Sequence, residues 1–244
     1  MVNILYVHKF CPRPLNAILG LFELKMSNSE DDLPQLSAHA LAALHEFYQE
    51  QEQKSRQEES VTNALGSEDV FKTDLQENWQ LSQFWYDDDS AVRLAEAALD
   101  AAGRNGRIVC ISAPTTYKKI KQLDKSSCDV KCLEYDERFK MFGEDFVFYD
   151  YKDPLNLPGK WKNTFDVVVV DPPFLSDECL CKTAVTVKFL AKEKIILCTG
   201  AVMEELALKL LQVKPCKFQP RHANGLQNQF ACFTNFESNH LETS

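Results

Sequence analysis

The chain has 244 residues, of which 45% are hydrophobic and 26% charged. This composition is typical of a globular protein with one domain of about 200 residues and a smaller additional part. No run approaches the roughly 20 apolar residues of a membrane-spanning helix, and a net charge of −9 gives no general affinity for DNA or RNA.

The first 25 residues are moderately apolar, but basic residues and prolines interrupt them. They show no small-residue cleavage site of the kind that ends a secretory signal peptide, so we expect a poorly ordered extension there. Met26 offers a second start. Residues 26–77 are predicted to form a small N-terminal helical part followed by an acidic linker.

Within this upstream part a helix is predicted over residues 38–53, with Ser37 as its N-cap and one apolar face. We expect that face to pack on the main domain rather than on a partner. Residues 1–77 carry 13 acidic and 6 basic side chains, whereas residues 78–244 carry 23 and 21. Most of the negative charge therefore lies upstream of a nearly neutral domain, which disfavours a nucleic-acid partner.

From residue 78 onward, strand-like and helix-like patterns alternate, as in repeated βα units. The helix that ends at Gly103 has Asp89 or Ser90 as its candidate N-cap. Further helices are predicted over residues 114–123, 139–141, 176–189 and 201–211. Strands are predicted over residues 107–112, 130–134, 146–149, 166–170, 194–199, 216–220 and 230–236. The sequence thus predicts an α/β fold with a doubly wound, mostly parallel seven-stranded sheet, whose last two strands form an antiparallel pair joined by a hairpin-like connection.

The most informative motif is Asp171-Pro172-Pro173-Phe174, which follows the β-branched run of a strand buried on both faces. In open α/β sheets ligands bind at this carboxyl edge. The acid and a proline carbonyl can each accept an N–H bond from an amine, while the aromatic ring packs against the group that carries it. The alternative is a stiff corner at which the acid caps the next helix.

Polar or tight-turning residues also follow the first three predicted strands. An acid after the second strand suits a ribose, because a carboxylate accepts hydrogen bonds from both hydroxyls. An acid after the third strand can reach the exocyclic amine of a purine. The residues concerned are Ser112, Ala113 and Pro114 after the first strand, Glu134 and Asp136 after the second, and Asp150 after the third.

The nine cysteines are predicted to be reduced thiols. Several lie inside strand-like runs, where a free cysteine packs as a small apolar residue. The pairs Cys179/Cys181 and Cys128/Cys132 have spacings that metal ligands use, but neither has a partner pair of histidines at zinc-finger spacing. We therefore expect no metal site.

Taken together, the strand-end residues and the Asp-Pro-Pro-Phe motif resemble the class I S-adenosylmethionine-dependent methyltransferases. The chain is most similar to a subfamily assigned to methylation of a lysine on translation elongation factor 1-alpha, and formerly labelled as putative adenine-specific DNA methyltransferases. The runs that carry this resemblance are QLSAHALAAL at 35–44, NWQLSQFWY at 78–86, EYDERF at 134–139 and LCTGA at 197–201.

The resemblance implies S-adenosylmethionine as cofactor and a catalytic role for the tetrapeptide that begins at Asp171. It also implies a ribose contact at Glu134 or Asp136 and an adenine contact at Asp150. Ser112-Ala113-Pro114 departs from the Gly-x-Gly turn that usually ends the first strand, so a less close backbone approach is expected. Trp85 and Tyr86 are predicted to compensate by covering the cofactor.

The sequence therefore predicts a cytoplasmic, monomeric protein-lysine methyltransferase whose partner is elongation factor 1-alpha. One alternative is an adenine methyltransferase that acts on DNA or RNA, and another is a binding module that keeps the fold without turnover. For His222, an exposed turn is favoured over a position in the substrate cleft.

Overall fold

The computed structural model describes residues 83–125, 127–225 and 229–242, together with positions 49, 75, 77, 78 and 81. Apart from Gln49, they all belong to the compact unit Gly66–Ser244. The extension predicted over residues 1–25 lies outside the described residues, as does the helix predicted over 38–53 except for Gln49, which is helical.

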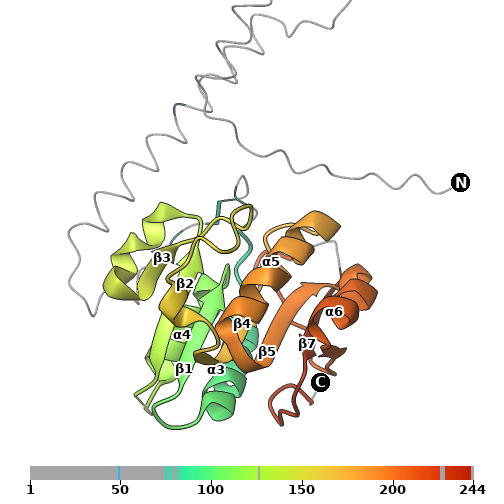
Figure 1. The fold of residues 1–244 in the computed structure, drawn as a ribbon. Helices are drawn as coiled ribbons and strands as arrows, with labels where there is room; N and C mark the ends of the chain where they lie inside the picture. Colours follow the sequence, from blue (N-terminus) through green and yellow to red (C-terminus); the bar gives the residue numbers. More distant parts are fainter. Residues whose placement is uncertain are drawn as a thin grey trace, which may run out of the picture. The chain divides into compact units, whose positions relative to one another are not determined.

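The described part of the chain contains a seven-stranded sheet in the order β3-β2-β1-β4-β5-β7-β6 (Figure 1). Strands β1 to β5 run parallel, while β7 is antiparallel to both β5 and β6. This confirms the doubly wound, mostly parallel sheet and the final antiparallel pair. The strands are β1 (Arg107–Ile111), β2 (Asp129–Glu134), β3 (Phe146–Phe148), β4 (Phe165–Val170), β5 (Ala191–Gly200), β6 (Lys214–Pro215) and β7 (Phe230–Thr234).

Helices cover both faces of the sheet. One face is covered by α3 and α4, which pack on each other, and the opposite face by α5 and α6 (Figure 1). The α-helices are α3 (Asp88–Ala102), α4 (Pro114–Leu123), α5 (Asp177–Leu190) and α6 (Glu204–Leu211). Short 3₁₀ segments are η3 (Glu137–Asp145), η4 (Gly159–Trp161) and η5 (Ala201–Met203).

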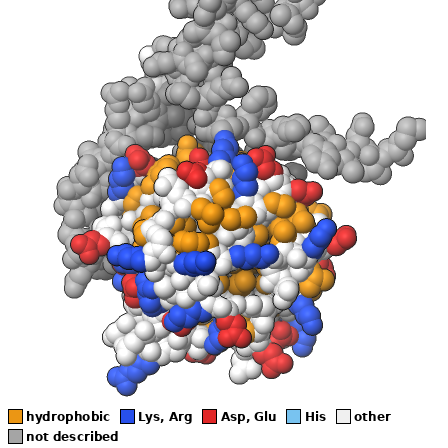
Figure 2. Space-filling model, viewed as in Figure 1, with side chains coloured by type: hydrophobic (Ala, Val, Ile, Leu, Met, Phe, Trp, Pro, Cys, Tyr) orange, Lys and Arg blue, Asp and Glu red, His pale blue; other side chains and the backbone are white. Residues whose placement is uncertain are grey.

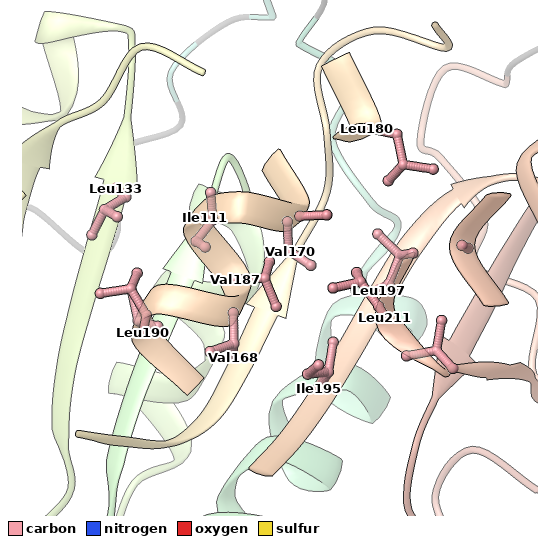
Figure 3. Packing of buried hydrophobic residues seen from close by; sticks show 14 of the residues in the cluster. Ile111, Leu133, Val168, Val170, Leu180, Val187, Leu190, Ile195, Leu197 and Leu211 are labelled. Atoms are coloured by element: carbon pink, nitrogen blue, oxygen red, sulfur yellow. The ribbon is translucent and has the colours of Figure 1, made fainter. Parts of the chain in front are cut away.

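The core on the α5 side is built from β-branched and leucine side chains of the central strands. Figure 3 shows Ile111, Val168 and Val170 facing α5, where Val187 and Leu190 meet them. All five side chains are fully buried, and each such burial stabilises the fold by about 1.5–3 kcal/mol. The carboxyl ends of β1 and β4 are therefore anchored in the buried core.

Several predicted bounds differ from the observed ones by a few residues, and the predicted N-cap of α3 and the predicted position of β6 were wrong. Helix α3 is capped by Asp87, whose carboxylate accepts from the Ser90 N–H at 2.8 Å, and not by Asp89 or Ser90. The strand predicted over residues 216–220 is β6 at Lys214–Pro215, because the chain then leaves the sheet edge: the Phe218 N–H donates to the Leu241 carbonyl at 3.0 Å.

The face covered by α5 and α6 carries apolar patches crossed by Lys and Arg side chains (Figure 2). Val185 on α5 and Leu208 on α6 are among its exposed apolar residues. None of the helices that the structure describes has the length and apolar character that a membrane span requires.

Candidate active site

The sheet reverses its winding direction between β1 and β4. The crevice in which open α/β sheets bind ligands is therefore expected outside the carboxyl ends of these two strands. Backbone hydrogen bonds continue past the strand ends and hold this edge together. The Asp171 N–H donates to the Ile111 carbonyl at 3.0 Å, and the Ser112 N–H donates to the Leu133 carbonyl at 2.8 Å. Asp171, Ser112 and the end of β2 are thus brought to neighbouring positions, as the sequence predicted.

Asp171 is fixed by a buried tyrosine. The Tyr86 hydroxyl donates to Asp171 Oδ2 at 2.6 Å, and the Tyr86 side chain is 6% exposed. Burial and the neighbouring Asp171 carboxylate raise the pKa of Tyr86 well above its usual value. Tyr86 therefore stays protonated and remains a hydrogen-bond donor throughout the physiological pH range.

The Tyr86 segment is held by a distant part of the chain. Tyr86 and His222 form an antiparallel bridge, which is flanked by bonds from the Asp87 N–H to the Arg221 carbonyl at 2.9 Å and from the Ala223 N–H to the Trp85 carbonyl at 2.9 Å. The connection between β6 and β7, predicted to be hairpin-like, therefore extends to the segment that contains Tyr86 and pairs with it.

His222 is half-buried rather than exposed, contrary to the favoured expectation. Its ring centroid lies 4.9 Å from that of Tyr86 and 4.7 Å from that of Phe230. Burial lowers the pKa of His222 below its usual value, so the ring is predominantly neutral at pH 7. The protein thus places an uncharged aromatic ring, rather than a cation, behind the Tyr86–Asp171 pair.

The rest of the tetrapeptide forms the corner between β4 and α5. Pro172 is buried, while Pro173 and Phe174 are half-buried, and the Phe174 ring lies 5.7 Å from that of Tyr151. Helix α5 is capped by Ser176, whose hydroxyl accepts from the Cys179 N–H at 3.2 Å. The motif therefore does form a corner between strand and helix, but Asp171 is not the helix cap, and that part of the alternative explanation is wrong.

The two acids after β2 have different environments. Asp136 is 5% exposed and accepts hydrogen bonds from Gln83 Nε2 at 2.7 Å and Arg138 Nε at 2.9 Å. Glu134 is 6% exposed and accepts through Oε1 from the N–H groups of Tyr135 and Asp136. No residue in the described part of the chain donates to Glu134 Oε2. Of the two carboxylates, Glu134 retains an oxygen for another donor.

The surroundings of Glu134 also change its protonation. Burial, supported by the charges of Asp136 and Asp171, raises the pKa of Glu134 to about 7. The predicted cofactor acid and the predicted catalytic acid are thus close enough for their charges to interact. At neutral pH a substantial fraction of Glu134 is therefore protonated.

The turn after β1 takes a glycine-like conformation without glycine. Ser112 has a φ of 52°, in the left-handed region that costs an ordinary residue about 1–2 kcal/mol. Ala113 is buried, and Pro114 begins α4. Ser112 therefore adopts the left-handed conformation that a glycine would take in a Gly-x-Gly turn. The sequence suggested that the backbone approaches the cofactor less closely here, and this stays a prediction.

The remaining predicted residues lie at the same edge with different contacts. Asp150 accepts from the Lys152 N–H at 2.8 Å in the turn after β3. Trp85 is half-buried: its indole N–H donates to the Leu75 carbonyl at 2.8 Å, and its ring stands edge-on to Phe139. These bonds tie Trp85 to the protein, and its contact with a cofactor stays a prediction.

Sequence reasoning missed a pair of exposed aromatic rings beside Glu134. Tyr135 is 48% and Phe148 46% exposed, with ring centroids 5.4 Å apart. The sequence could have indicated this pair, because Tyr135 directly follows β2 and Phe148 ends β3. Among the described residues, no group of three or more His, Cys, Asp or Glu side chains is placed to hold a metal ion.

Comparisons with known proteins place this site in a family. Residues 77–238 match the sequence model of a family described as probable N6-adenine methyltransferase. The protein "EEF1A lysine methyltransferase 1" is 53% identical in Mus musculus and 51% identical in Homo sapiens, each over 215 residues that cover 87% of this chain and 97% of that protein. The Saccharomyces cerevisiae "Protein-lysine N-methyltransferase EFM5" is 37% identical over 228 residues, covering 83% of this chain and 92% of that protein.

Among solved structures, a SAM dependent methyltransferase from Aquifex aeolicus is 13% identical with a TM-score of 0.41, covering 70% of this chain and 100% of that chain. The sequence relatives are matched along nearly their whole length. The chain therefore belongs to the family of EEF1A lysine methyltransferase 1, which the matching sequence model describes as probable N6-adenine methyltransferase.

Proposed function

We propose that this protein transfers a methyl group from S-adenosylmethionine to a lysine side chain of translation elongation factor 1-alpha. The observation that carries the proposal is Asp171, a carboxylate that Tyr86 holds at the carboxyl end of β4, in a chain 53% identical to an enzyme named for that activity. A fixed carboxylate suits a reaction in which a nitrogen becomes positively charged.

The strand-end residues fit the proposed cofactor. Glu134 Oε2 is available for the ribose hydroxyls, and Asp150 lies after the next strand for the adenine amine. The exposed rings of Tyr135 and Phe148 offer apolar faces beside them. The left-handed backbone at Ser112 lies at the same edge, directly after β1. When bound, the cofactor supplies an electrophilic methyl group on a positively charged sulfur.

The residues of the Asp-Pro-Pro-Phe motif would position the substrate amine. A lysine must lose a proton before it can attack, which costs about 4 kcal/mol near pH 7.4 for a pKa of about 10.4. Burial at the crevice favours the neutral amine, whereas Asp171 favours the ammonium form. Asp171 helps most in the transition state, when the nitrogen acquires charge, while a proline carbonyl accepts an N–H bond and Phe174 forms a wall beside the side chain.

The decisive experiment offers the enzyme three substrates with isotopically labelled S-adenosylmethionine: purified elongation factor 1-alpha, duplex DNA and RNA. Mass spectrometry should find the label on a lysine of the elongation factor. Label in nucleic acid and none in the factor would establish the adenine methyltransferase alternative, which the family description favours. Cofactor binding without label in any substrate would instead identify a module without turnover.

Tyr86→Phe should lower kcat about tenfold and change the KM for the cofactor less than twofold. The substitution removes one hydrogen bond to the Asp171 carboxylate, and bonds to charged groups contribute about 1.5–3 kcal/mol. Tyr149→Phe is the matched control. It also removes a hydrogen bond of a buried tyrosine hydroxyl, in this case the bond to Thr186 at 2.9 Å, at the same sheet edge. Equal losses of kcat in both variants would show that Tyr86 acts through stability alone.

We further propose that the enzyme acts in the cytoplasm as a monomer. The eight cysteines in the described part of the chain are all free thiols, as expected in a reducing compartment. Cell fractionation and size-exclusion chromatography would check the two statements separately.

A further inference from the structure

Three cysteines form a row across the antiparallel end of the sheet. Cys198 on β5 is directly opposite Cys232 on β7. Pro215 on β6 is opposite Phe233, and the next residue, Cys216, donates its N–H to the Cys232 carbonyl at 2.8 Å. Cys232 therefore has one thiol neighbour on each side, and these neighbours belong to segments far apart in the sequence.

The backbone places Cys216 and Cys232 within reach of a disulfide. Opposed residues of antiparallel strands have Cα atoms about 4.5–5.5 Å apart, inside the range of about 4.4–6.8 Å that disulfides use. Both side chains lie on one face, because Cys216 Sγ is 3.5 Å from Oγ1 of Thr234, two residues after Cys232. Bond formation would require side-chain rotation rather than movement of a strand.

The two thiols differ in exposure and ionisation. Cys216 is half-buried, whereas Cys232 is fully buried. The hydrogen bond with the Cys232 thiol is the largest cause that lowers the pKa of Cys216, to about 7. The pKa of Cys232 is raised well above its usual value by its thiol neighbours and by burial. Cys216 is thus the nucleophile, and Cys232 keeps its proton until a second step needs its sulfur.

We propose that Cys216 and Cys232 form a peroxide-reactive dithiol site. The Cys216 thiolate attacks one oxygen of hydrogen peroxide and becomes a sulfenic acid, while the other oxygen leaves as hydroxide and takes up a proton to form water. The Cys232 sulfur then attacks the Cys216 sulfur, and the sulfenic hydroxyl leaves as a second water. Two thiols and one peroxide give one disulfide and two waters.

Neighbouring cysteines do not share this combination of features. Cys181 is exposed, but it lies on α5, away from the row. Cys198 is opposite Cys232 as well, yet it is fully buried, so an oxidant in solvent does not reach it directly. The site therefore has one accessible nucleophile and one buried resolving thiol, which is the arrangement that favours a disulfide over further oxidation.

The test treats the full chain with about one equivalent of hydrogen peroxide, alkylates the remaining thiols and maps disulfides by peptide mass spectrometry. A Cys216–Cys232 disulfide should be the main product, and it should revert with dithiothreitol. Cys216→Ser should abolish it, whereas the control Cys181→Ser should leave its yield unchanged. In Cys232→Ser, dimedone should trap a sulfenic acid at Cys216.

Three results would overturn the proposal: oxidation of Cys181 before Cys216, a persistent sulfenic acid at Cys216 in the unaltered protein, or a Cys198–Cys232 disulfide as the main product. The measurements on the unaltered protein and on Cys216→Ser decide the question even if Cys232→Ser does not fold. None of them depends on the methyl-transfer reaction, so they stand independently of the proposed function.

Discussion

Methyl transfer should fall about a hundredfold to a thousandfold in Asp171→Ala, while the dissociation constant of S-adenosylmethionine changes less than about threefold. Losing one preorganised group that stabilises transition-state charge typically has an effect of this size. The loss should appear in kcat rather than in KM, because the carboxylate favours the protonated, unreactive lysine in the ground state. Single-turnover kinetics with elongation factor 1-alpha would measure it.

The same strand offers a matched control for this substitution. Asp166 lies near the start of β4, where it accepts from the Arg107 N–H at 2.8 Å and pairs with Lys192. Asp166→Ala removes a carboxylate from β4 itself, at the end opposite the one that Asp171 follows. It should lower stability and leave kcat within about twofold. Comparable activity in Asp171→Ala and the unaltered enzyme would reject the role assigned to Asp171.

Glu134→Gln should weaken S-adenosylmethionine binding about 10- to 100-fold, as measured by calorimetry at pH 8. A carboxylate can accept from both ribose hydroxyls, and hydrogen bonds to a charged group contribute about 1.5–3 kcal/mol. Glutamine places an amide donor where one of the carboxylate oxygens was. The substitution therefore removes the charge and one acceptor while nearly preserving the shape of the side chain.

The pH dependence of binding provides a second measurement on Glu134. Its pKa of about 7 in the protein without ligand means that a proton must leave before the carboxylate can accept two hydrogen bonds. The affinity for S-adenosylmethionine should therefore rise as pH increases from 6 to 8 and level off above the pKa. In Glu134→Gln this rise should disappear, since the amide does not titrate.

Although Glu134→Gln should weaken cofactor binding, it should raise the stability of the protein without ligand. A folded-state pKa above the unfolded value of 4.5 means that the folded protein binds the proton more tightly. The stabilisation is fully present below pH 4.5 and is lost as pH rises through about 7. At pH 8, without ligand, the variant should have a free energy of unfolding about 1–3 kcal/mol higher, measured by urea denaturation.

Asp136→Asn is the control for both measurements on Glu134. Its carboxylate is engaged by Gln83 and Arg138, so the substitution should lower stability and change cofactor affinity less than Glu134→Gln does. An unaltered dissociation constant in Glu134→Gln, together with a weakened one in Asp136→Asn, would transfer the ribose contact to Asp136.

Local patterns predicted the central βα units well because the forces that form them are local. The β-branched run that ends at Val170 gives β4, and Pro114 begins α4 where a proline fits a first helical turn. Ser176 precedes α5 and caps it through its own hydroxyl. The strand-end acids followed from this order, since parallel strands bring successive carboxyl ends to one edge.

The contacts that hold Asp171 in place, namely its hydrogen bond from Tyr86 and the pairing of Tyr86 with His222, could not be predicted in the same way. Tyr86 and His222 are 136 positions apart, and no periodicity within either segment indicates that they pair. The sequence predicted a strand over residues 216–220, but the Phe218 N–H donates to the Leu241 carbonyl, outside the sheet. The choice between Glu134 and Asp136 likewise depended on Arg138 and Gln83, whose hydrogen bonds exist only in the folded domain.

The position of β7 between β5 and β6 has a consequence for biosynthesis. A ribosome that has released the chain only as far as β6 leaves the β5 edge unpaired, because its partner is synthesised later. Phe230, which opens β7, also supplies a ring against which His222 rests behind Tyr86. Nascent or prematurely terminated chains that end before residue 230 would thus expose the unpaired edge of β5 to chaperones and proteases. They would also lack one of the aromatic rings that support the catalytic site.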